Sequence, residues 1–112
     1  MDKDLLKSIE GKVLSVDSYT FYQDEEYVED SSRNMIILLI ETSQGLKKIN
    51  FKYEKPDELA LMCLNKIFRG NKVLYTISSY DSNRGGKITE YYLRITSGIS
   101  SGVEYFYYSR SE

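Results

Sequence analysis

Residues 56–70 read PDELALMCLNKIFRG and form the one clear helical pattern in a chain of 112 residues. Pro56 suits the first turn of a helix, and Asp57 and Glu58 place negative charge near its positive end. Gly70 can end the helix because glycine readily takes the left-handed backbone conformation. The apolar side chains recur at intervals of three and four and should share one face: Ala60, Cys63, Leu64, Ile67 and Phe68. The stretch therefore predicts a single amphipathic helix.

The segments before this helix have the patterns of β-strands. Residues 12–22 alternate imperfectly, as expected of a long, bent strand that changes sheets. Residues 35–41 are apolar up to Ile40, which indicates a strand covered on both faces, and the sequence TSQG at 42–45 predicts a tight turn. Residues 46–53 show the clearest alternation in the chain. Residues 5–9 fit either a short helical turn or a lead-in strand.

The segments after the helix also predict strands. Residues 73–77 and 88–96 read as two strands joined by a glycine-rich hairpin loop at 80–87. Residues 97–102 form a connector, and residues 103–108 read as a short strand or a docked tail. The aromatic side chains of that last segment need burial, against an edge of this sheet or against a second subunit.

Composition limits the classes of protein to consider. With 41% hydrophobic and 29% charged residues, the chain fits one soluble domain, which we expect to be cytoplasmic. The longest apolar run has strand length, so no membrane segment is predicted, and the acidic start lacks the pattern of a signal peptide. The single cysteine, Cys63, cannot form an intramolecular disulfide and is expected to be a small buried residue. The chain has no histidine, which excludes histidine-based catalysis and metal sites built from histidine. We predict a non-enzymatic protein without a cofactor.

Charge is distributed unevenly along the chain. The net charge is −2, but residues 1–30 hold 3 basic and 9 acidic groups, whereas residues 31–112 hold 12 basic and 8 acidic groups. The body of the domain can therefore present a positive surface to an anionic ligand. The 11 tyrosines offer exposed rings on which bases can stack, although β-rich proteins favour tyrosine in any case.

Three groups of residues are candidates for ligand binding. Cations can follow phosphates while aromatic rings stack on bases, and this combination occurs on residues 46–53 and in two loops. The candidates are Lys48, Asn50, Lys52 and Tyr53 on the strand, Tyr80, Arg84 and Lys87 at the hairpin, and Tyr22, Tyr27 and Arg33 in the loop after the first strand. The alternatives are an ordinary solvated strand face, a plain glycine hairpin and a solvated acidic loop. The acidic run within residues 24–30 lacks the spacing of a metal site.

The order of elements, with residues 57–69 helical between strands 46–53 and 72–78 and a basic loop at 81–87, resembles that of OB-fold single-stranded-DNA-binding proteins. The small members encoded by phages and mobile elements are the most similar, and the resemblance spans about residues 9–96. It implies a mainly β chain folded as one domain, residues 1–112, with a five-stranded barrel, one helix between strands three and four, and residues 97–112 as a C-terminal extension. An SH3-like or Sm-like barrel is the alternative. The chain lacks the tryptophan and the long acidic tail of the bacterial members.

The resemblance also implies a function. Such proteins bind single-stranded DNA through strands two and three and the loops after strands one and four, which matches the three candidate groups. We therefore expect sequence-tolerant binding of single-stranded DNA, with RNA as the alternative ligand, in replication or recombination of a mobile element. The competing hypothesis is a protein-interaction or structural assembly subunit, with a homo-oligomer formed through residues 103–108.

Overall fold

The computed structural model describes residues 3–19, 22–23, 26–27, 35–52 and 58–111. Six strands form one antiparallel sheet, two short strands pair separately, and one helix lies between β5 and β6. The elements are β1 (Asp4–Tyr19), β2 (Tyr22–Gln23), β3 (Glu26–Tyr27), β4 (Met35–Thr42), β5 (Gly45–Lys52), α1 (Glu58–Phe68), β6 (Lys72–Asp81), β7 (Lys87–Ile95) and β8 (Glu104–Ser111).

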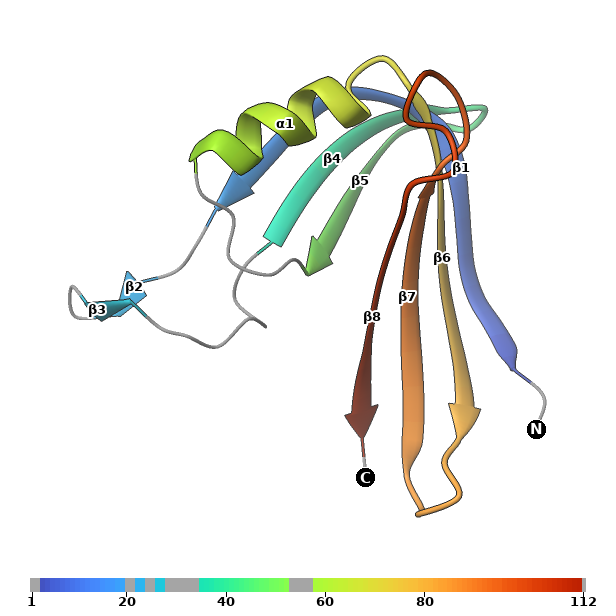
Figure 1. Cartoon of the computed structure of the whole chain (residues 1–112). Helices are drawn as coiled ribbons and strands as arrows, with labels where there is room; N and C mark the ends of the chain where they lie inside the picture. The colour runs from blue at the N-terminus through green and yellow to red at the C-terminus, as the bar shows by residue number, and fades with distance from the viewer. Residues whose placement is uncertain (1–2, 20–21, 24–25, 28–34, 53–57, 112) are drawn as a thin grey trace.

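The sheet has the strand order β5-β4-β1-β6-β7-β8 and bends sharply along β1 (Figure 1). The N-terminal half of β1 pairs with β6 and its C-terminal half pairs with β4, and Lys12 has a register partner in both strands. The bend divides the sheet into a first arm, made of β5, β4 and the C-terminal half of β1, and a second arm, made of the N-terminal half of β1, β6, β7 and β8 (Figure 1). One strand thus holds both arms together.

Local sequence explains the position of the bend. The register of β1 against β4 shifts between Val13 and Ser15, and an irregular register of this kind bends a strand. Gly11 lies so close to β4 that a Cβ atom there would collide with the Glu41 carbonyl oxygen. The turn after α1 fills the gap between β4 and β6: the Val13 N–H donates to the Asn71 carbonyl (2.9 Å), and the Gly70 N–H donates to the Val13 carbonyl (2.8 Å).

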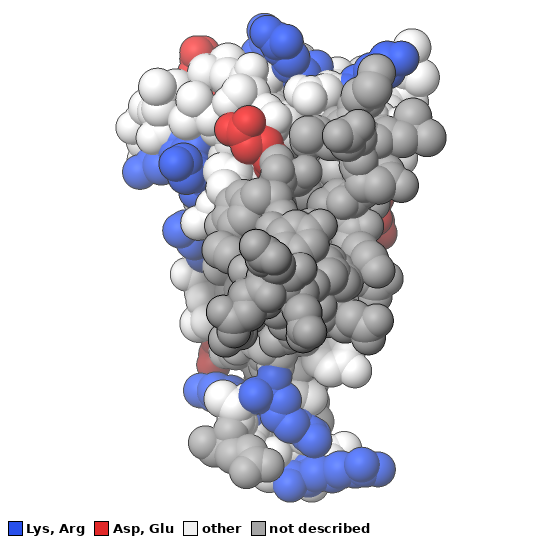
Figure 2. Space-filling model, turned by 90° about the vertical axis from the view of Figure 1, so that its left-hand side faces the viewer, with Lys and Arg blue, Asp and Glu red and all other residues white. Residues whose placement is uncertain are grey.

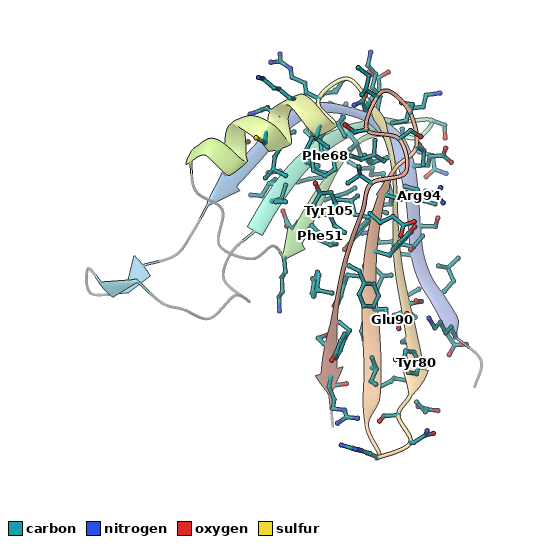
Figure 3. The ribbon with its side chains drawn as sticks, in the orientation of Figure 1. Phe51, Phe68, Tyr80, Glu90, Arg94 and Tyr105 are labelled. Atoms are coloured by element: carbon teal, nitrogen blue, oxygen red, sulfur yellow. The ribbon has the colours of Figure 1, made fainter. Side chains whose placement is uncertain are left out.

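The hydrophobic core lies in the angle between the two arms. We call the face of the sheet that carries these core residues the inner face and the opposite face the outer face. Figure 3 shows Phe51 of β5, Phe68 of α1 and Tyr105 of β8 converging in this angle. The buried apolar side chains come from both arms and the helix: Val13, Val16, Ile36, Leu38, Ile40, Ile49, Phe51, Leu64, Phe68, Val73, Tyr75, Leu93 and Ile95.

The helix ends as predicted, whereas its predicted start at Pro56 and Asp57 lies outside the described residues. α1 packs against β1, and Gly70 follows it with φ at 81°, as expected for a helix-ending glycine. Leu64 and Phe68 are buried and Ile67 is partly buried, which confirms the apolar stripe at these positions. The expected burial of Cys63 is wrong, because its side chain is exposed to solvent. Ala60 has no described side chain.

The structure confirms a mainly β chain with one helix between the third and fourth strands of the main sheet. It does not confirm a five-stranded closed barrel, because the described strands form one open sheet of six. The sixth strand is β8: the segment predicted at residues 103–108 as a short strand or a docked tail forms a longer strand, 104–111, which pairs with the edge of β7. Residues 5–9 prove to be strand, and no helical turn forms there.

Within the described residues, α1 is the one helix, and it is far too short to span a bilayer.

Candidate nucleic-acid interface

Tyr107 of β8 lies where the two edge strands of the sheet approach each other. Its ring meets Phe51 of β5 edge-to-face, with centroids 5.1 Å apart and an interplanar angle of 78°. Its hydroxyl oxygen hydrogen-bonds to the backbone of Lys52, and the Lys52 ammonium lies 5.7 Å from the centre of its ring. At this distance a cation is attracted to the electron-rich ring face. Side-chain contacts, without strand pairing, therefore connect β5 to β8.

A second tyrosine stacks on Tyr107. Tyr91 is its register partner on β7, and the two rings are almost parallel, at 4°, with centroids 4.4 Å apart. Tyr75 of β6 lies deeper in the same cluster and contacts Phe51 edge-to-face at 6.3 Å. Burial, reinforced by the neighbouring Tyr91, raises the pKa of Tyr75 to about 12, and burial also raises the pKa of Tyr107. Like unperturbed tyrosines, both phenols are neutral at physiological pH and add no negative charge to the site.

The inner face continues from this pair of rings toward the β6–β7 hairpin. Two residues farther along the strands, on the same face, lie the half-buried hydroxyl side chains of Thr89 and Ser109. Two residues beyond Thr89, β7 begins with the exposed Lys87. At about 3.3 Å per residue, Lys87 lies about 13 Å from the Tyr91 position along β7. We call this surface the inner-face track, and it consists of Lys52, Tyr107, Tyr91, Thr89, Ser109 and Lys87.

Basic side chains gather at the hairpin end of the track. Arg84 and Lys87 are exposed in the hairpin, and Arg110 of β8 reaches it because its guanidinium donates to the Ser82 hydroxyl oxygen (2.5 Å). The same oxygen accepts the Arg84 backbone N–H (3.2 Å), which fixes the turn. Figure 2 shows Lys and Arg groups at the lower end of the molecule, where Figure 1 places the hairpin. The track therefore runs from one cation, across two aromatic rings, to Lys87 and Arg84 at the hairpin, while Arg110 reaches the hairpin from the outer face of β8.

The outer face of the second arm has a different chemistry. Tyr80 lies there, opposite in strand alternation to the buried Ser79, and the Lys3 ammonium sits 5.5 Å from the centre of its ring. Lys3 also pairs with Glu90 at 2.6 Å, so its charge is partly neutralised. This hydrogen bond to Glu90 raises the pKa of Lys3. The outer face thus mixes acidic, basic and aromatic groups without a continuous positive line.

The residues predicted on β5 separate into two places. Lys48 and Asn50 are exposed and alternate with the buried Ile49 and Phe51, so they point to the outer face of the first arm. Lys52 ends the strand, where its ammonium reaches the ring of Tyr107. The structure therefore brings Lys52, but neither Lys48 nor Asn50, into contact with an aromatic ring of the track.

The loop candidates also divide. Arg84 and Lys87 lie together in the hairpin, while Tyr80 lies on the other face of the sheet. Tyr22 and Tyr27 are register partners in the two-stranded pairing of β2 with β3, and their side chains lie outside the described part of the structure. Arg33 and Tyr53 lie outside the described residues altogether.

The sequence reasoning missed Tyr91 and Tyr107 in the site, and also Arg110, which reaches the neighbouring hairpin from the outer face. All three lie on strands β7 and β8, where the alternation of residues 104–111 already placed Tyr105 and Tyr107 on one face. Full-length pairing of this segment with residues 87–95 would have identified the stacked pair. Treating residues 103–108 as a short segment concealed that signal.

Comparisons with protein-family models, with curated proteins and with solved structures find no match to this chain. Its function therefore has to be argued from the chemistry of the site.

Proposed function

We propose that the chain binds single-stranded nucleic acid, DNA in the first instance, along the inner-face track. The observation that carries this proposal is the continuity of the track: the Lys52 ammonium lies on Tyr107, Tyr107 stacks on Tyr91, and the strand that holds Tyr91 leads to Lys87 and the basic hairpin. Cations that follow a phosphate backbone, interleaved with flat rings, are the components of sequence-tolerant binding to single strands.

The energetics of such a site are favourable in two ways. Each base stacked on an aromatic ring contributes about 1–3 kcal/mol, and each phosphate neutralised by a lysine or arginine releases bound counterions. Neutral phenols are a better platform than phenolates would be, because a negative ring would repel the phosphates.

We infer an OB-like architecture in which β8 substitutes for closure of the sheet. Three features support it: the helix lies between the third and fourth strands of the sheet, β1 pairs with both β4 and β6, and Tyr107 links β8 to β5. With the sequence resemblance, this architecture favours a non-enzymatic role in replication or recombination of a phage or mobile element.

Fluorescence anisotropy with labelled oligo-dT at low salt tests the proposal. We expect binding at micromolar protein that weakens as salt increases, because phosphate contacts dominate the affinity. Arg84→Ala combined with Lys87→Ala should lower the affinity and reduce the slope of log K against log salt by roughly 1.4, or about 0.7 per phosphate contact. The matched control is Lys66→Ala combined with Arg69→Ala at the other end of the molecule (Figure 1), which removes the same charge and should leave binding unchanged.

Absence of binding at micromolar protein, or binding that does not respond to salt, would refute this function. The same titrations with oligo-U distinguish DNA from RNA.

A protein-assembly role is the second candidate, and one observation favours it. Phe106 and Tyr108 on β8 are 54% and 65% exposed, which is unusual for large apolar side chains next to each other on one strand face. β8 cannot be deleted to test this role, because its removal would take away one of the two strands that pair with β7 along its whole length. Point substitutions on its outer face are the suitable probe.

A further inference from the structure

β8 is an edge strand of the sheet that the described residues form. In the part of the chain that the structure describes, β8 pairs with β7 on one side, and the sheet order ends with it. Eight consecutive residues of extended backbone at a sheet edge are a template for a further strand. The question is which strand could occupy that edge.

The outer face of β8 carries a symmetric arrangement of side chains. Tyr105, Tyr107 and Ser109 are half-buried on the inner face, whereas Glu104, Phe106, Tyr108 and Arg110 are exposed on the outer face. The rings of Phe106 and Tyr108 lie 6.3 Å apart. A carboxylate therefore stands at one end of the strand, a guanidinium at the other, and two aromatic rings between them.

This arrangement is complementary to itself when the strand is reversed. In an antiparallel pair of two β8 strands centred on Tyr107, Glu104 of one copy lies opposite Arg110 of the other, and Phe106 lies opposite Tyr108. Because of the two-fold symmetry, each of these facing pairs occurs twice in the interface. Opposite charges and paired aromatics on facing positions stabilise strand pairing, whereas like charges in these positions oppose it. A shift of the register by two residues in either direction separates both charge pairs.

We propose that two copies of this chain associate by antiparallel pairing of their β8 strands about a two-fold axis at Tyr107. The partner is a second copy because an isologous interface requires a self-complementary patch, and β8 provides one in its charges and in its aromatic side chains. Backbone hydrogen bonds along the edge supply affinity, and the outer-face side chains set the register. This inference does not depend on nucleic-acid binding, which uses the inner face.

Contacts within the monomer hold both charged groups close to the strand. Glu104 accepts a hydrogen bond from the Tyr92 hydroxyl (2.6 Å) and lies 3.8 Å from Arg94, while Arg110 donates to Ser82 (2.5 Å). A carboxylate has further acceptor sites and a guanidinium has five N–H donors, so each group can still engage a partner. Association then costs less side-chain entropy than it would for unrestrained groups.

A charge-swap series on the full chain tests the proposal, with oligomeric state measured by sedimentation across a concentration range. Wild type should form dimers. Glu104→Arg and Arg110→Glu should each raise the dimer dissociation constant roughly ten-fold or more, because two attractive pairs become repulsive. An equimolar mixture of the two variants should dimerise again, since every pair across that interface is then of opposite charge. The double variant, which exchanges the charges within one chain, should also recover.

The control is Arg69→Glu, which makes the same charge change at the end of α1 and should leave the dimer intact. Phe106→Ser and Tyr108→Ser should weaken association without disturbing the monomer, because both side chains are exposed. They keep the test decisive if Glu104→Arg fails to fold through loss of its bond to Tyr92. The proposal is overturned if wild type stays monomeric at high concentration, if the two Ser variants dimerise as wild type does, or if folded charge variants fail to recover on mixing.

Discussion

The Tyr91 and Tyr107 rings lie face to face across the β7–β8 pair, 4.4 Å apart and within 4° of parallel. A stack of this kind fixes both side chains before any ligand arrives. Because the Lys52 ammonium covers the ring of Tyr107 and Phe51 supports its edge, the pair is held from two sides. A site that is already ordered has less entropy to lose on binding.

Removing the ring of Tyr107 should weaken nucleic-acid binding. Tyr107→Ala is expected to lower the affinity for oligo-dT by roughly 5- to 150-fold, the range for one aromatic platform, because Tyr91 loses the ring on which it stacks and Lys52 the ring over which it lies. Tyr107→Phe keeps the ring and should retain affinity. Circular dichroism must show that both variants fold. If Tyr80→Ala on the outer face had the larger effect, the strand would lie on the other side of the sheet.

Lys52 and Lys48 should behave differently although both belong to β5. Lys52→Met removes the cation beside Tyr107 and should reduce the salt slope of binding by about 0.7. Lys48→Met removes the same charge from the outer face of the first arm and should leave affinity and slope unchanged. Equal losses in the two variants would place the ligand on β5 itself and contradict the inner-face track.

Alkaline pH should destabilise the fold through Tyr75. Its pKa is raised from about 10 in the unfolded chain to about 12 in the folded protein. Below about pH 10 the Tyr75 phenol is protonated in both the folded and the unfolded state, so its contribution to the free energy of unfolding is fully present. This contribution is lost as the pH rises from about 10 through 12, because the unfolded state releases the proton first. Urea unfolding should show a loss on the order of 2 kcal/mol across this window.

Tyr75→Phe provides the control for this pH dependence. The variant should lose less stability over the same window, because the phenol that titrates is gone. An identical loss in both proteins would assign the effect to other tyrosines.

Gly11→Ala should destabilise the domain strongly. The new methyl group would collide with the Glu41 carbonyl oxygen on β4, and a backbone atom in a paired strand cannot move away cheaply. We expect a loss of about 2–4 kcal/mol in the free energy of unfolding, measured by chemical denaturation. Ser15→Ala, at an exposed position of the same strand, should change it by less than about 0.5 kcal/mol.

The sequence predicted most of the elements but not all of their neighbours. The helix, its end at Gly70 and the β4–β5 and β6–β7 hairpins followed from local patterns, because periodicity and turn residues act over short distances. Alternation also identified which face of β5 is buried. It could not tell whether residues 5–9 extend β1, because strand formation there depends on pairing with β6, far along the chain.

The candidate site was predicted less completely for the same reason. Arg84 and Lys87 were found because a hairpin places them together, whereas Arg110 joins them only through the pairing of β8 with β7. The surroundings of Lys52 likewise depend on Tyr107, which is more than fifty residues away in the sequence. Contacts of this range follow from the assembled sheet and leave no local trace.

The shared strand β1 has a consequence for folding. Because it supplies a pairing partner to β4 at one end and to β6 at the other, neither arm retains a complete set of hydrogen bonds once β1 detaches. No half of the molecule is a self-sufficient unit that could survive the loss of the other. Unfolding should therefore occur in a single cooperative step, with no stable half-structured species along the way.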